Sequence, residues 1–148
     1  MKSSVFNTSF ENMLRIMVLM DVVGSPINTD RLTALDFICI YGKKCRVLSS
    51  NLHGNNEFGF AEFTNKRKKI SEAIKIAVKN DYVTVLVNEN GLVYSLNDRG
   101  KNIVIGLEST YAIKYKKGAK IIVKRFNNFS DDSLLQYINN IATDYGEV

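Results

Sequence analysis

A change of hydrophobic period along residues 66–96 constrains the fold of this chain more than any other feature. From Lys66 to about Asp81 the apolar residues recur at helical spacing (Ile70, Ala73, Ile74, Ala77, Val78). Residues 82–87 and 92–96 are instead β-branched and aromatic, and Asn90-Gly91 lies between them. Asn-Gly tolerates the positive φ that a tight turn between antiparallel strands requires. The sequence therefore predicts a helix that continues, with almost no loop, into a β-hairpin.

Helical patterns lie on both sides of this unit. The expected helices cover 9–23, 30–41, 60–80, 98–107 and 109–126, and a last helix begins at Ser130. The expected caps are Ser9 for the first helix, Asn28 or Thr29 for the second and Asn97 for the fourth. Gly42 would end the second helix, and Thr64-Asn65 is a candidate break in the third. Residues 43–59 contain turn-forming clusters and are expected to be irregular.

The order of these elements, three helices, a hairpin and a further helix, is typical of a winged helix. Leu96-Asn97-Asp98-Arg99-Gly100 resembles the Leu-Thr-x-x-Gly start of the helix that follows the wing. We predict an α+β, mostly helical fold: a winged helix-turn-helix with extra N- and C-terminal helices. Residues 1–148 would form one domain, with a core at about 28–108 and a helical extension over 109–148. The alternative is an unrelated α+β domain. A structure in which strands 83–87 and 92–96 are not antiparallel neighbours would exclude the winged helix.

Size and composition limit where the protein works. The 148 residues are 45% hydrophobic and 24% charged, enough to bury a core without disulfides or a structural metal. The two cysteines, Cys39 and Cys45, fit a reducing compartment. The apolar run Met13–Val23 contains Arg15 and Asp21 and is shorter than the roughly 20 residues of a membrane span. We expect a cytoplasmic protein without membrane contact.

Residues for chemistry are sparse. His53 is the one histidine, and Cys45 is its nearest soft ligand, whereas a zinc site needs three or four ligands. The glycines form no phosphate-binding loop, and Glu57 and Glu62 have no supporting group for acid–base work. We therefore expect no enzyme activity, no cofactor, no metal and no small-molecule substrate.

Charge is unevenly distributed. The formal net charge is +5, but residues 31–126 hold 18 basic and 8 acidic side chains. Residues 127–148 hold four acidic side chains and no basic ones. A basic body points to an anionic partner, either nucleic acid or an acidic protein face, although the same charges also solubilise a surface.

Two basic features follow from this distribution. The first comprises the candidate contacts Lys66, Arg67, Lys68, Lys69, Lys75 and Lys79, on the helix that reads DNA in winged domains. Adjacent residues fan around a helix, and lysines suit backbone contact better than base readout, so DNA phosphates, a partner protein and solvent all remain open. The second comprises Lys114, Lys117, Lys120 and Lys124, on a helix whose aromatic stripe packs within the chain or against a partner.

Four short motifs resemble a known family. They are Arg31-Leu32-Thr33-Ala34-Leu35-Asp36-Phe37, Asn51-Leu52-His53-Gly54, Glu62-Phe63-Thr64-x-x-Arg67 and the Ala73-Ile74-Lys75 helix before the hairpin. Over about residues 13–108 the chain resembles the middle component of bacterial three-component ABC-ATPase conflict systems, which overlap Lamassu-type antiphage defence.

The resemblance implies an adaptor with no catalytic residue. Its partners would be an SMC-like ABC ATPase that senses invading DNA and an effector, often a nuclease, with DNA contacted through the complex. The implied contact surface is the segment 51–63 and the hairpin, with candidate residues Leu52, His53, Glu62, Phe63 and Asn90.

A second hypothesis, motivated by Lys66–Lys69, is a free winged-helix transcriptional regulator. Such a regulator would dimerise alone and bind one DNA site. An adaptor would co-purify with an ATPase and bind DNA weakly and without sequence preference.

Overall fold

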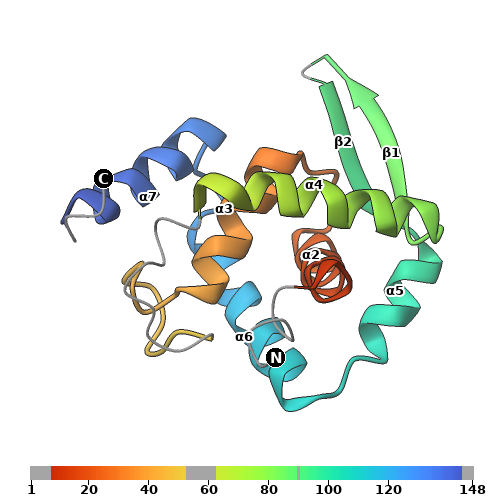
Figure 1. Cartoon of the computed structure of the whole chain (residues 1–148), viewed down its shortest axis with the longest axis horizontal. Helices are drawn as coiled ribbons and strands as arrows, with labels where there is room; N and C mark the ends of the chain where they lie inside the picture. The colour runs from red at the N-terminus through yellow and green to blue at the C-terminus, as the bar shows by residue number, and fades with distance from the viewer. Residues whose placement is uncertain (1–7, 53–62, 90, 145–148) are drawn as a thin grey trace.

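The computed structural model describes residues 8–52, 63–89 and 91–144 (Figure 1). In chain order these residues form α2 (Ser9–Val23), α3 (Thr29–Ile40), α4 (Phe63–Lys79), β1 (Val83–Asn88), β2 (Gly91–Leu96), α5 (Asp98–Ile105), α6 (Thr110–Arg125) and α7 (Asp131–Asp144). The expectation of a mostly helical α+β chain is confirmed. No helix within these ranges combines the length and the apolar character that crossing a membrane requires.

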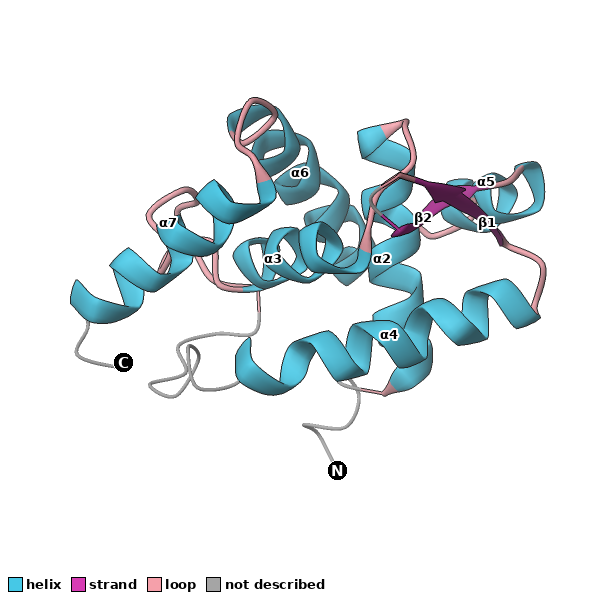
Figure 2. Cartoon of the chain, turned by 90° about the horizontal axis from the view of Figure 1, so that it is seen from above, coloured by secondary structure: helices cyan, strands magenta, loops and turns pink. Residues whose placement is uncertain are grey.

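The helices form three layers. α2 and α3 lie in the middle, α4 packs on one side of them, and α6 packs on the other (Figure 2). α7 lies against α3, while the hairpin projects beyond α4 near the other end of the molecule (Figure 1). The buried core runs from Met13 to Ala142, so helices outside the expected 28–108 core also contribute to it.

The helix–hairpin unit is confirmed. β1 and β2 are antiparallel neighbours, with Val85 opposite Tyr94 and Asn88 opposite Gly91. Gly91 has φ +115°, which favours glycine at this turn. After β2, Asn97 caps α5 by accepting from the Gly100 N–H at 2.8 Å, and its amide donates to the Asp81 carbonyl at 2.8 Å. Gly100 leaves room for the Tyr82 carbonyl, where a Cβ would collide.

Several boundaries differ from expectation. Thr8, not Ser9, caps α2, because its hydroxyl accepts from the Glu11 N–H at 3.1 Å. α4 is described from Phe63 and continues without a break through Thr64-Asn65, while its expected start near Phe60 lies outside the described residues. α3 ends with Tyr41 as its cap residue, one residue before the expected Gly42.

The connection between α3 and α4 is long. A helix-turn-helix joins its helices through about three or four residues, whereas residues 41–62 separate these two. Just before α3, Ile27 pairs with Tyr94 of β2 in an isolated antiparallel bridge, which adds a third backbone segment beside the hairpin. The winged helix-turn-helix therefore stays a prediction, while the helix–hairpin order is established.

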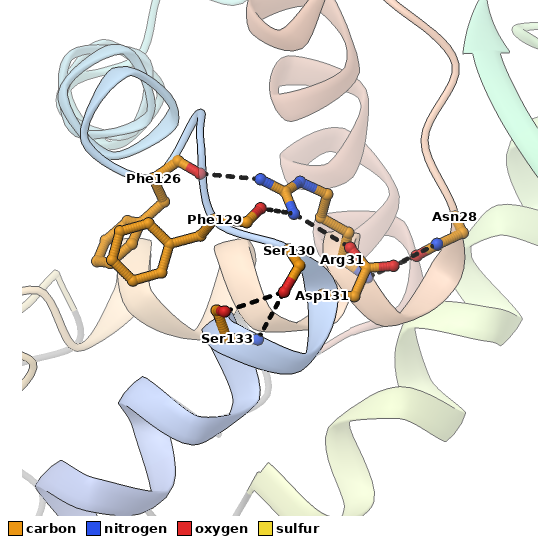
Figure 3. Close-up of polar contacts among 7 residues, drawn as sticks. All are labelled: Asn28, Arg31, Phe126, Phe129, Ser130, Asp131 and Ser133. Carbon is orange, nitrogen blue, oxygen red and sulfur yellow. Dashed lines mark hydrogen bonds and ion pairs between the residues drawn. The ribbon is translucent and has the colours of Figure 1, made fainter.

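Arg31 of α3 ties down the turn between α6 and α7 (Figure 3). Its guanidinium donates to the Phe129 carbonyl at 2.7 Å, to the Phe126 carbonyl at 2.9 Å and to the Asp131 carboxylate at 3.1 Å. Asn28, which caps α3, donates to the other Asp131 oxygen at 2.7 Å. One cation thus satisfies the carbonyls at the end of α6 and the acidic first turn of α7.

We expect Arg31→Met to loosen α7 without unfolding the other helices. The substitution removes three hydrogen bonds to the 126–131 turn but keeps an apolar stem. Hydrogen exchange of residues 131–144 should accelerate at least tenfold, while α2 and α3 stay protected.

Arg46→Met is the matched control, because Arg46 also pairs with a residue of α7, Asp144, but at an exposed site. Exposed pairs contribute little, so this variant should exchange like the wild type. Equal effects of the two substitutions would contradict the anchoring role of Arg31.

Candidate functional site

The basic face of α4 is the first candidate site. Lys68, Lys75 and Lys79 are exposed and, at spacings of seven and four, share the outward side of the helix. Lys69 is also exposed but projects from a different side. Among the described residues, no carboxylate lies within ion-pair distance of these four ammonium groups. They are available to an external anion.

The other two cations of the predicted cluster are already bonded. Lys66 is 8% exposed and turns inward, where its Nζ lies 3.1 Å from an Asp36 oxygen. Arg67 stays at the surface, and its Nε donates to Asp30 at the start of α3. The four adjacent cations therefore do not form one surface patch, since the helix distributes them around its axis.

Asp36 is the centre of a buried polar cluster. Its Oδ1 accepts from Arg15 Nε at 3.0 Å and from the Tyr115 hydroxyl at 2.6 Å, while Lys66 approaches Oδ2. Arg15 also donates to Asn12. These side chains come from α2, α3, α4 and α6, so one fully buried carboxylate joins all three layers.

The charges of this cluster set the protonation states of its members. Burial by itself would raise the pKa of Asp36, but the positive charges of Arg15 and Lys66 hold that pKa well below its usual range. Burial and then the negative charge of Asp36 raise the pKa of Tyr115 well above its ordinary value. The carboxylate therefore stays ionised and the phenol stays a hydrogen-bond donor at neutral pH.

We expect Asp36→Asn to destabilise the fold by roughly 3–5 kcal/mol at pH 7, because it leaves Arg15 and Lys66 buried without a counter-charge. Since the pKa of Asp36 is lowered on folding, its contribution is complete above about pH 5 and is lost as pH falls. The difference in the free energy of unfolding between wild type and variant, measured by urea unfolding, should therefore become smaller below about pH 4.

The exposed Asp30, paired with Arg67, provides the control. Asp30→Asn should lower the free energy of unfolding by less than about 1 kcal/mol, and its difference from wild type should not shrink at low pH. Similar profiles for the two variants would contradict the role assigned to Asp36.

Lys66 and Lys68 give a second comparison on a single helix. Lys66→Gln removes a buried partner of Asp36 and should lower the free energy of unfolding by about 1–3 kcal/mol. Lys68→Gln alters an exposed side chain and should stay within about 0.5 kcal/mol of wild type. Thermal unfolding measures both values, and equal stabilities would show that Lys66 is not held inside in solution.

A groove lies between α4 and the hairpin. It encloses about 510 Å³ and is lined by Thr29, Ser71, Ile74, Lys75, Val78, Lys79, Val85, Leu92 and Tyr94. Its hairpin wall is apolar and open to solvent, since Val85 is 40% and Leu92 52% exposed. Two of the exposed α4 lysines, Lys75 and Lys79, border it.

α6 carries the second basic face. Lys114, Lys117, Lys120 and Lys124 are all exposed, and the described residues place no carboxylate in ion-pair contact with them. Ile113 and Ile121, which are about half exposed, lie among them. The opposite side of α6 is buried, with Tyr115, Ala119, Ile122 and Phe126 in the core. α4 and α6 lie on opposite sides of α2 and α3 (Figure 2), so the two basic faces point apart.

The partner contacts implied by the resemblance are less exposed. Leu52 is half-buried, and its N–H donates to the Ile40 carbonyl at 2.8 Å. Phe63 is half-buried and packs edge-on against Phe37, with ring centroids 5.1 Å apart. His53, Glu62 and Asn90 lie outside the described residues.

Two features had no part in the sequence interpretation. Arg15 and Asp36 lie inside apolar helical runs, and a charged residue at such a position is a signal of burial with a partner. That signal could have indicated the cluster, although not its geometry. The groove has no comparable signal, because its walls are brought together only by packing.

The fold and these surfaces define a class: a small, mostly helical α+β domain with two separate basic faces. In the part of the chain that is described, no three His, Cys, Asp or Glu side chains form a group that could hold a metal ion.

Residues 5–147 match the family model described as ABC-three component (ABC-3C) system Middle Component 2. The chain belongs to this family, which confirms the resemblance, and it is a component of a multi-subunit ABC system. No curated protein and no solved structure matches the chain.

Proposed function

We propose that this chain is the non-catalytic adaptor of its ABC-three component system. It would join an SMC-like ABC ATPase to an effector such as a nuclease, in antiphage or antiplasmid defence of the Lamassu type. Membership of the middle-component family is the observation that carries this proposal, because the family name itself places the protein among other components.

The arrangement of charge supports a bridging role. An adaptor contacts two partners at once, and this fold offers exposed lysines on α4 and on α6, separated by the α2–α3 layer. Exposed charges at an interface accelerate association and fix the orientation of the partners more than they add affinity. DNA held by the ATPase would be a further anionic partner for the exposed lysines.

The inner polar groups support the absence of catalysis. Asp36, Arg15 and Tyr115 are buried, and each bonds to another member of the cluster. Arg15 and Tyr115 border a small cavity between α2 and α6, but both already bond to Asp36, which supports a structural role for them.

A DNA-binding winged-helix regulator is the second candidate. The observation in its favour is topological: a helix, the Ile27 bridge, two helices and the hairpin follow the winged-helix order. The outward lysines of α4 would then contact phosphates.

Co-expression with the other components of the system separates the two candidates. We expect the chain to co-purify with the ATPase in a defined complex and to show weak, sequence-blind DNA binding when alone. Charge reversal of Lys117 and Lys120 on α6 should weaken one pairwise contact at least tenfold, and reversal of Lys68 and Lys75 on α4 should weaken the other.

The measurements are size-exclusion chromatography with light scattering, and titration of each purified partner at two salt concentrations. Recovery of a free dimer that binds one DNA site tightly would overturn the adaptor and favour the regulator. If charge reversal on one face abolished the contacts with both partners, the bridging arrangement would be overturned.

A further inference from the structure

The groove between α4 and the hairpin combines an apolar wall with a basic rim. Val85 and Tyr94 are cross-strand partners, as are Val87 and Leu92, so all four lie on one face of the hairpin. Val87 is 78% exposed, the highest value among the large hydrophobic residues that the structure describes. Ile74 and Val78 of α4 complete the wall.

The charge of the groove has one sign. Lys75 and Lys79 border it, and none of its lining residues is acidic. These two lysines are four residues apart, a rise of about 6 Å along α4. Two carboxylates one turn apart on a neighbouring helix have the same separation.

We propose that this groove binds an acidic amphipathic helix of a partner protein. The apolar face of that helix would cover Val85, Leu92 and Val78, with anchors at positions i, i+3, i+4 and i+7. Its acidic flank would pair with Lys75 and Lys79. The proposal adds a binding site to the proposed adaptor function. It depends on that function only in naming another component of the system as the source of the helix.

Nucleic acid fits these residues less well. Lys75 and Lys79 can contact phosphates at the rim, but the exposed Val85 and Leu92 of the hairpin wall offer a nucleic acid no cation and no polar donor. Base edges are read mainly by Asn, Gln and Arg, and none of these residue types lines the groove.

A second copy of this chain is also a poor occupant. α7 carries the acidic residues Asp131, Asp132 and Asp144, but its apolar stripe is buried against the chain's own core. The polar side that α7 leaves exposed has no anchors for the hairpin wall. The partner is therefore a different protein with a free amphipathic helix.

Neighbouring residues of β1 provide a matched test. Val85 lines the groove, whereas Leu86, at 43% exposure, lies on the opposite face of the same strand. In the co-expressed complex, a photo-crosslinking amino acid at Val85 should couple to an acidic helical segment of one component. The same amino acid at Leu86 should not. Coupling at both positions, at neither, or to DNA would overturn the proposal.

Affinity gives a second measurement that does not need the complex. The probe is a synthetic helical peptide of about 20 residues with leucine anchors and glutamate flanks, and its control has lysine in place of glutamate. The acidic peptide should bind the full chain at least tenfold more tightly than its control. Val85→Asp and the pair Lys75→Glu and Lys79→Glu should each weaken binding at least tenfold.

The controls for the affinity test are Leu86→Asp and the α6 pair Lys117→Glu and Lys120→Glu, which should change binding less than twofold. Thermal unfolding verifies that the variants fold. Equal binding of the two peptides, or equal loss in the control variants, would overturn the proposal. A Val85-dependent homodimer would overturn it in favour of a second copy. Co-purification that survives Val85→Asp would overturn the groove assignment and leave the adaptor function in place.

Discussion

Asp36 is the constraint on which the rest of the structure depends. A carboxylate with no solvent exposure is unfavourable unless opposite charges and hydrogen-bond donors surround it, and here they come from α2, α4 and α6. Each donor has to arrive at one point, so the cluster sets the rotation and register of three helices relative to α3. Apolar contacts alone tolerate more variation in packing. The orientation of α4 that this produces decides which of its lysines face outward.

The two basic surfaces are consequences of that orientation. With Lys66 turned toward Asp36, the side chains of Lys68, Lys75 and Lys79 point away from the core. Tyr115 likewise faces Asp36, which leaves Lys117, Lys120 and Lys124 on the outer side of α6. The same buried carboxylate thus orients both candidate surfaces, on opposite sides of the molecule. In the adaptor function that we propose, each of these surfaces would contact a different component.

Local pattern predicted what depends on near neighbours in the chain. The hairpin, the Asn97 cap and the apolar stripe of α6 were all correctly predicted, because turn chemistry and helical period act within a few residues. Lys66–Lys69 show where that reasoning ends. Four adjacent cations look alike in sequence, yet one is buried, one pairs with Asp30 and two are exposed. The irregular segment expected over 43–59 lies between α3 and α4, which residues 41–62 separate.

The sequence by itself determined the secondary-structure order, the mostly helical class and the excess of basic residues, and its short motifs indicated the family. Tertiary structure alone decided that Arg15, Asp36, Lys66 and Tyr115 meet, that Arg31 anchors the α6–α7 turn, and that α4 and the hairpin enclose a groove. The physical reason is distance along the chain. Periodicity and capping report interactions within a turn or two, whereas Arg15 and Tyr115 reach the same carboxylate from 21 and 79 residues away.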